Sequence, residues 1–158
     1  MSDQVAVMHD GQFEQIDTPR NLYKNPQTSF VAGFVGDTNR FEIESTDSDS
    51  IMTKGGWKLK RADLSMTSQG TPEVFYIRPE AFILNPDIHI DGMDQIEVQF
   101  EVTIKTILFD GSNTKLSTMV SGSSEELLIS LPQNAQFDGI EEDHKLNVGI
   151  HRDDIKCF

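Results

Sequence analysis

Apolar and polar residues alternate one by one along much of this chain, which is the pattern of strands. The clearest run covers residues 97–104, where Val98, Phe100, Val102 and Ile104 fall on one side. A period of two is typical of a strand with one buried and one wet face. Further strands are predicted over residues 41–45, 57–60, 74–77, 116–120, 126–131 and 146–150.

The first residues of the chain predict a β-hairpin. The Asp10-Gly11 pair lies between two arms in which Val5, Val7 and Phe13 alternate with other residues. An Asp-Gly pair between such arms is a strong signal for a tight hairpin turn.

Two short helices are expected after the hairpin. Thr18 followed by Pro19 is a helix start, because the hydroxyl can cap free N–H groups and the proline ring suits the first turn. Pro26 prevents this helix from continuing through the residue before it. The second helix is predicted over residues 28–34, and Gly36 just past its end acts as a stop.

From residue 37 onward the chain reads as short strands between turns, without a long helix. Residues 46–50 form a polar turn that lacks the ligand spacing of a calcium loop, and residues 63–72 are expected to be a loop. Residues 107–109 break the alternation, which predicts a β-bulge or a change of sheet. The predicted class is therefore mainly β, a small antiparallel barrel or sandwich preceded by a hairpin and two short helices.

Composition narrows the function. The chain has 158 residues and a net charge of −13, which disfavours binding to nucleic-acid backbones. Its single cysteine, Cys157, excludes an internal disulfide and fits a reducing cytoplasm. No apolar run approaches the roughly twenty residues that span a bilayer.

The sequence shows none of the common catalytic or metal-binding motifs. The sequence contains no phosphate-binding loop, no paired histidines at metal spacing and no G-x-S-x-G. The adjacent residues 141–144 do not converge on one ion, and the acidic loop with Asp87, Asp91 and Asp94 reads as solvated surface. We therefore expect no catalytic residue, no metal site and no cofactor in this chain.

The beginning of the chain resembles a known family. Residues 2–41 contain Ser-Asp-Gln-Val-Ala-Val-Met, Asp-Thr-Pro-Arg-Asn-Leu-Tyr and Ser-Phe-Val-Ala-Gly-Phe-Val-Gly, in this order. This sequence resembles the segment at the C-terminal end of the ATPase domain of import-type ABC transporter subunits, which leads into their regulatory domain. The motif positions are Ser2, Asp3, Gly11, Thr18, Pro19, Tyr23, Pro26, Phe30 and Gly36.

The resemblance continues further along the chain. Arg78-Pro79-Glu80 matches a motif that the family places after a strand in its regulatory domain, and residues 109–111 and 151–155 match more loosely. Asp17 departs from the family, which usually has glycine before Thr-Pro. The wording of residues 30–36 and 39–41 is most similar to the spermidine/putrescine branch.

The resemblance implies a specific organisation. Residues 1–36 would be the tail end of the ATPase domain with its linker helices, and residues 37–158 a TOBE-type, OB-like regulatory domain of two intertwined lobes. The ATPase domain, with its Mg-ATP site, would precede residue 1. The implied partners are that ATPase domain, a second copy in a homodimer, and membrane permease subunits at the inner face of the cell membrane.

The candidate functional residues lie where strands end and where the chain enters the barrel. They are Arg78, Pro79 and Glu80 at a strand tip, with Gly36 and Asn39 at the barrel entrance. The guanidinium group of Arg78 can bind a carboxylate or several backbone carbonyls. One interpretation is therefore a local ion pair with Glu80. The alternative function is a stand-alone OB-like module for a small ligand or oligonucleotide, which would not need residues 1–41.

Overall fold

A computed structural model describes residues 3–66, 70–84, 98–132 and 140–158 of the chain. Several sequence-based expectations concern residues outside these ranges, namely Ser2, the acidic loop with Asp87, Asp91 and Asp94, and Glu97. Within the described part, the protein has a two-stranded sheet, two short helices, a six-stranded sheet and a five-stranded sheet. The predicted mainly β class is confirmed.

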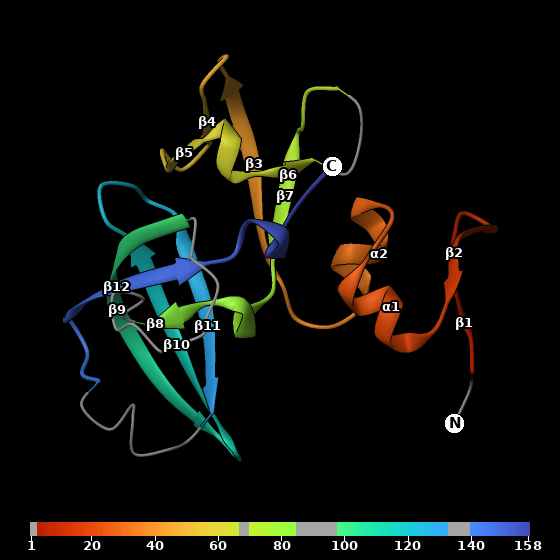
Figure 1. Cartoon of the computed structure of the whole chain (residues 1–158). Helices are drawn as coiled ribbons and strands as arrows, with labels where there is room; N and C mark the ends of the chain where they lie inside the picture. The colour runs from red at the N-terminus through yellow and green to blue at the C-terminus, as the bar shows by residue number, and fades with distance from the viewer. Residues whose placement is uncertain (1–2, 67–69, 85–97, 133–139) are drawn as a thin grey trace, which may run out of the picture.

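The N-terminal arm, residues 3–36, projects from the rest of the molecule (Figure 1). Strands β1 (Val5–His9) and β2 (Gln12–Asp17) form the predicted hairpin. Asp10 and Gly11 take φ angles of 51° and 76°, the left-handed conformation that a tight hairpin turn requires.

Both predicted helices of the arm are present. Helix α1 (Pro19–Lys24) begins with the Thr18 hydroxyl accepting the Asn21 N–H, and α2 (Ser29–Phe34) begins with Thr28 accepting the Val31 N–H. The two helices lie between the hairpin and the barrel, so the arm touches the rest of the molecule through them (Figure 1).

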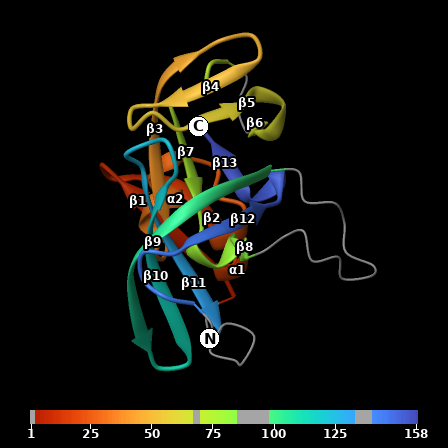
Figure 2. The same cartoon turned by 90° about the vertical axis from the view of Figure 1, so that its left-hand side faces the viewer.

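The body consists of the two larger sheets, which Figure 2 shows one above the other. The six-stranded sheet has the order β5-β4-β3-β7-β13-β6, and the five-stranded sheet has the order β11-β10-β9-β12-β8. The first comprises β3 (Asn39–Thr46), β4 (Ser50–Thr53), β5 (Lys58–Lys60), β6 (Ser65–Met66), β7 (Val74–Ile77) and β13 (Ile155–Cys157). The second comprises β8 (Ile83–Leu84), β9 (Val98–Asp110), β10 (Asn113–Val120), β11 (Glu126–Pro132) and β12 (Lys145–Ile150).

The chain passes between the two sheets twice, each time through a short 3₁₀ turn. The first crossing, η2 (Pro79–Ala81), leads from β7 to β8, and the second, η4 (Arg152–Asp154), leads from β12 back to β13. The last strand, β13, pairs with β7 antiparallel and with β6 parallel. Each of the two larger sheets forms one lobe of the barrel-like body, and the chain leaves the first lobe and returns to it. The two lobes are therefore intertwined, as the resemblance implied.

One apolar core fills the space between the sheets. It includes Phe41 and Phe75 from the six-stranded sheet and Val102 and Leu116 from the five-stranded sheet, each at most 2% exposed. Trp57 packs against both phenylalanines, with ring centroids 5.3 and 5.9 Å away. The body is thus held chiefly by burial of apolar surface.

The bulge predicted in the long strand is confirmed, slightly earlier than expected. Residue 105 of β9 is left out of the pairing, because Ser117 pairs with Thr106 and Thr118 pairs with Ile104. Val98, Val102 and Ile104 are buried on the expected face before the bulge. The expectation of a loop over residues 63–72 is wrong at Ser65–Met66, where β6 forms with β13 as a distant partner.

Two polar ties join the lobes. The Asn39 side chain, at the start of β3, donates to the Leu128 carbonyl at 2.8 Å and accepts the Leu128 N–H at 2.7 Å. The Glu125 carboxylate accepts the Gly55 N–H at 2.7 Å, and the Ser124 N–H donates to the Gly55 carbonyl at 2.8 Å. No helix in the described part of the chain is long and apolar enough to cross a membrane.

Candidate functional site

Arg78 lies where the arm, the connecting segment and the barrel meet. Its guanidinium donates to the carbonyls of Asp37 at 3.1 Å, Gly36 at 3.4 Å and Tyr23 at 3.5 Å. The same group stacks over the Tyr23 ring, 4.3 Å from its centroid. Partial burial lowers the pKa of Arg78. The side chain therefore holds the end of α1 and the entrance to β3 against the first crossing between the sheets.

The expected ion pair between Arg78 and Glu80 does not form. Within the described residues, the guanidinium binds backbone carbonyls, and the exposed Glu80 carboxylate has no hydrogen bond or salt bridge. The reason lies in Pro79, which starts the η2 turn with Arg78 as its N-cap residue. Arg78 extends toward the arm, whereas Glu80 belongs to the turn itself.

Gly36 is required by the same junction. Its φ angle is +81°, a conformation that favours glycine, and an added Cβ would lie 3.0 Å from Tyr23 Cε2. The Tyr23 ring thus contacts both Gly36 and Arg78. Of the five candidate residues, the structure brings Gly36, Arg78, Pro79 and Glu80 to this junction.

Asn39 has a different place from the other candidates. It is 8% exposed and its amide pairs with both backbone groups of Leu128 on β11, while also donating to the Ile77 carbonyl at 3.3 Å. β11 is the edge strand of its sheet, so the Asn39 amide takes the place of a neighbouring strand there. Its position is structural and joins the two lobes.

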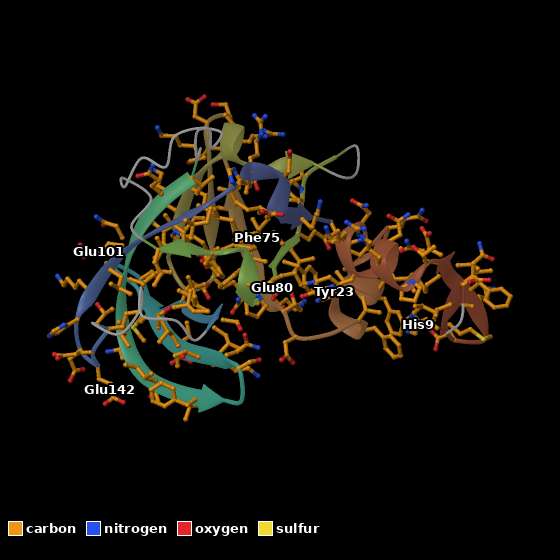
Figure 3. All side chains as sticks on the ribbon, turned by 60° about the horizontal axis from the view of Figure 1, so that its bottom comes forward. His9, Tyr23, Phe75, Glu80, Glu101 and Glu142 are labelled. Carbon is orange, nitrogen blue, oxygen red and sulfur yellow. The ribbon has the colours of Figure 1, made fainter. Side chains whose placement is uncertain are left out.

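A cleft of about 350 Å³ opens beside Arg78, between the helices of the arm and the barrel. Its walls come from α1, α2, β7, β13 and both crossing turns. Figure 3 shows Tyr23 and Glu80 near each other at this boundary. The cleft therefore touches both points at which the chain passes from one sheet to the other.

Sequence reasoning missed the role of Asp17. Its carboxylate accepts the Thr18 N–H at 2.8 Å and the Asn21 side-chain amide at 3.1 Å, and these bonds lower the pKa of Asp17. The residue that departs from the family pattern thus stabilises the start of α1. The signal was an aspartate next to a Thr-Pro helix start, where a carboxylate can bind free N–H groups.

The outer face of the arm's hairpin is apolar and uncovered. Met8 pairs with Phe13 across the two strands, and both side chains are more than half exposed. Ile16 and Phe34 are exposed to a similar degree. Within the described residues, no three His, Cys, Asp or Glu side chains gather closely enough to hold a metal ion.

The fold defines the class of protein as an OB-like barrel. The molybdate-binding protein ModG, solved with molybdate bound, matches with a TM-score of 0.51 over 75% of this chain and 92% of that chain. Because the two sequences are only 14% identical, the likeness concerns the fold alone. No family model matches the sequence.

The sequence relatives are ATP-binding subunits of ABC transporters. The chain is 38% identical over 130 residues to the uncharacterized ABC transporter ATP-binding protein YdcT of Escherichia coli, covering 82% of this chain and 30% of YdcT. It is 50% identical over 95 residues to the spermidine/putrescine import protein PotA of Trichormus variabilis, covering 54% and 24%. The sulfate/thiosulfate import protein CysA of Caulobacter vibrioides is 29% identical over 143 residues, covering 88% and 36%.

The chain is therefore homologous to part of the ATP-binding subunits of ABC importers. It spans about a third of the length of the curated relatives it matches. Both polyamine and sulfate importers are among these relatives, so the resemblance is confirmed for the importer ATP-binding subunits as a group.

Proposed function

We propose that this chain is the C-terminal regulatory and dimerisation domain of the ATP-hydrolysing subunit of an ABC import system. The homology to importer ATP-binding subunits and the OB-like fold support this role. The observation that carries the proposal is the Arg78 junction. Arg78 extends from the barrel and binds both the arm and the connecting segment, so a displacement of the arm would be transmitted to the barrel.

The arm would connect the barrel to the ATPase domain of the same subunit. Its uncovered apolar face, with Met8, Phe13 and Ile16, supports this assignment, because a two-stranded sheet with an exposed apolar face is only marginally stable in water. The barrel would hold two such subunits together as a homodimer bound to the permease subunits, at the inner face of the cell membrane.

The decisive experiment compares Arg78→Ala with Arg20→Ala in the full-length subunit. Arg20 is exposed on α1 and serves as the matched control. Arg78→Ala should shorten the lifetime of the dimer or lower transport per ATP hydrolysed by about tenfold, the equivalent of about 1.4 kcal/mol. Nucleotide affinity should stay close to that of the unmodified subunit. Loss of ATP binding with an intact dimer would overturn the proposal.

The nucleotide site itself lies outside this chain in the proposed arrangement. Millimolar Mg-ATP should leave the melting temperature of the isolated chain unchanged, because a ligand stabilises only the state that it binds. The isolated chain should still form a homodimer at micromolar concentration. Light scattering that gives a monomeric mass at all concentrations would refute the dimerisation role.

For the transported substrate we propose polyamines. The supporting evidence is the amino-acid sequence of residues 30–36 and the relatives named as spermidine/putrescine import proteins. Deletion of the gene for the full subunit should abolish uptake of radiolabelled spermidine and putrescine, and uptake of labelled sulfate should continue. The opposite result would assign the system to the sulfate importers.

A further inference from the structure

The cleft between the arm and the barrel has charged side chains of both signs on its rim. Acidic residues come from the two crossing turns, with Glu80 on η2 and Asp153 and Asp154 on η4. Basic residues come from the end of α1 and from β13, namely Lys24 and Lys156. The rim thus carries three acidic and two basic side chains, whereas the protein as a whole has a net charge of −13.

These opposite charges do not neutralise one another. Within the described part of the chain, none of the five side chains forms a hydrogen bond or a salt bridge. Arg78, the sixth charged group of the cleft, differs because its donors are bound to backbone carbonyls. The rim therefore offers anionic and cationic groups that a ligand can bind without breaking existing contacts.

The floor of the cleft is largely apolar. Tyr76 and Ala32 are buried there, Pro26 is buried beside them, and the Tyr23 ring forms part of the wall. A volume of about 350 Å³ lies at the small end of the range for small-molecule sites. An apolar floor with a few polar groups at the rim is the usual composition of such sites.

We propose that this cleft binds a small zwitterion with an apolar body, of the size of an amino acid or dipeptide. Its ammonium group would lie among Glu80, Asp153 and Asp154, and its carboxylate between Lys24 and Lys156. The apolar body would contact Tyr23 and Tyr76. Such a ligand touches both the arm and the barrel, so its binding stabilises one relative position of the two.

The proposal can be tested on the isolated chain with three matched probes. Phenylalanine carries both charges, phenethylamine lacks the carboxylate, and 3-phenylpropionate lacks the ammonium group. Calorimetric titration should show phenylalanine binding at least about tenfold more tightly than either analogue, since each loses one charge-assisted contact. Backbone amide signals of residues 23–26 and 153–156 should shift during the titration.

Variants identify the site. Glu80→Gln combined with Asp154→Asn, and separately Lys24→Gln combined with Lys156→Gln, should each weaken phenylalanine binding by about tenfold. Asp49→Asn and Lys58→Gln change exposed charges remote from the cleft and should bind as the unmodified chain does.

Three results would overturn the proposal. They are equal binding of phenethylamine and phenylalanine, unchanged binding by both cleft variants, and no binding of any probe at millimolar concentration. The test uses no ATPase activity, so its failure leaves the proposed role in the importer untouched.

Discussion

The arm and the body of this protein obtain their order from different sources. The body buries a continuous core of aromatic and aliphatic side chains between two sheets. The arm's own apolar cluster buries only the side chains of Val7, Leu22 and Val31, and most of the large apolar side chains that stay exposed in the described residues belong to the arm. The body can therefore fold through its own core, whereas the arm depends on its junction with the body.

Removing a central core ring should have the largest effect. Phe75 is fully buried and contacts the rings of Phe41 and Trp57. Phe75→Ala should lower the free energy of unfolding by about 3–5 kcal/mol, measured by urea titration. Phe109→Ala removes the same ring from a site that is 77% exposed and should change it by less than about 0.5 kcal/mol. Similar losses in both variants would contradict the proposed location of the core.

The polar tie between the lobes should rank second. Asn39→Ala leaves the backbone groups of Leu128 without their side-chain partner in a largely buried place. We expect the free energy of unfolding to fall by about 1–3 kcal/mol. Asn147→Ala, on the exposed side of β12, is the matched control and should be nearly neutral. Equal effects would mean that the Asn39 amide does not join the lobes.

Gly36 tests the junction between arm and body. Gly36→Ala and Gly122→Ala both place a side chain at a φ angle near +80°, which costs about 1–2 kcal/mol. Only at Gly36 does the new Cβ meet the Tyr23 ring. We expect hydrogen exchange of the α1 amides to accelerate in Gly36→Ala and not in Gly122→Ala. Unchanged hydrogen exchange in both variants would mean that the order of α1 does not depend on the contact between Gly36 and Tyr23.

The smallest expected effect concerns the pH dependence of the arm. The Thr18 N–H and the Asn21 amide lower the pKa of Asp17 in the folded chain. The stabilisation is therefore present above the unfolded pKa of about 3.9 and is lost as pH falls through the folded pKa. Protection of the Thr18 backbone N–H, which donates to Asp17, should decrease on acidification below about pH 4, and Asp17→Asn should remove most of this dependence. Asp49→Asn is the control and should leave this pH dependence unchanged.

The arm was predicted closely because its signals are local. The Asp10-Gly11 turn and the Thr18 cap act within a few residues of themselves, so the sequence alone determines them. The alternation of apolar and polar residues predicts the strands of the body, but this alternation does not indicate which strands pair with one another. The pairing of β13 with β6 joins residues about ninety positions apart, and two residues are too few for a period to appear.

The candidate site was predicted in part. The Arg-Pro-Glu motif predicts Arg78 as a functional residue, and the chemistry of its guanidinium predicts that it can bridge several carbonyls. Its partners Tyr23, Gly36 and Asp37 lie 41 to 55 residues earlier, and no local pattern indicates that they approach it. The cleft escaped prediction for the same reason, because its charged groups come from α1, β13 and the two crossing turns, which lie far apart in the sequence.

The two crossings also decide how this protein can be divided. A cut after β8 would leave the six-stranded sheet without β13, and the five-stranded sheet would lose β8. Neither lobe is therefore a transferable module, and a gene fusion or domain exchange has to carry both lobes across together. Recombination between this chain and its relatives should accordingly succeed at the arm, before β3, and fail at every point inside the barrel.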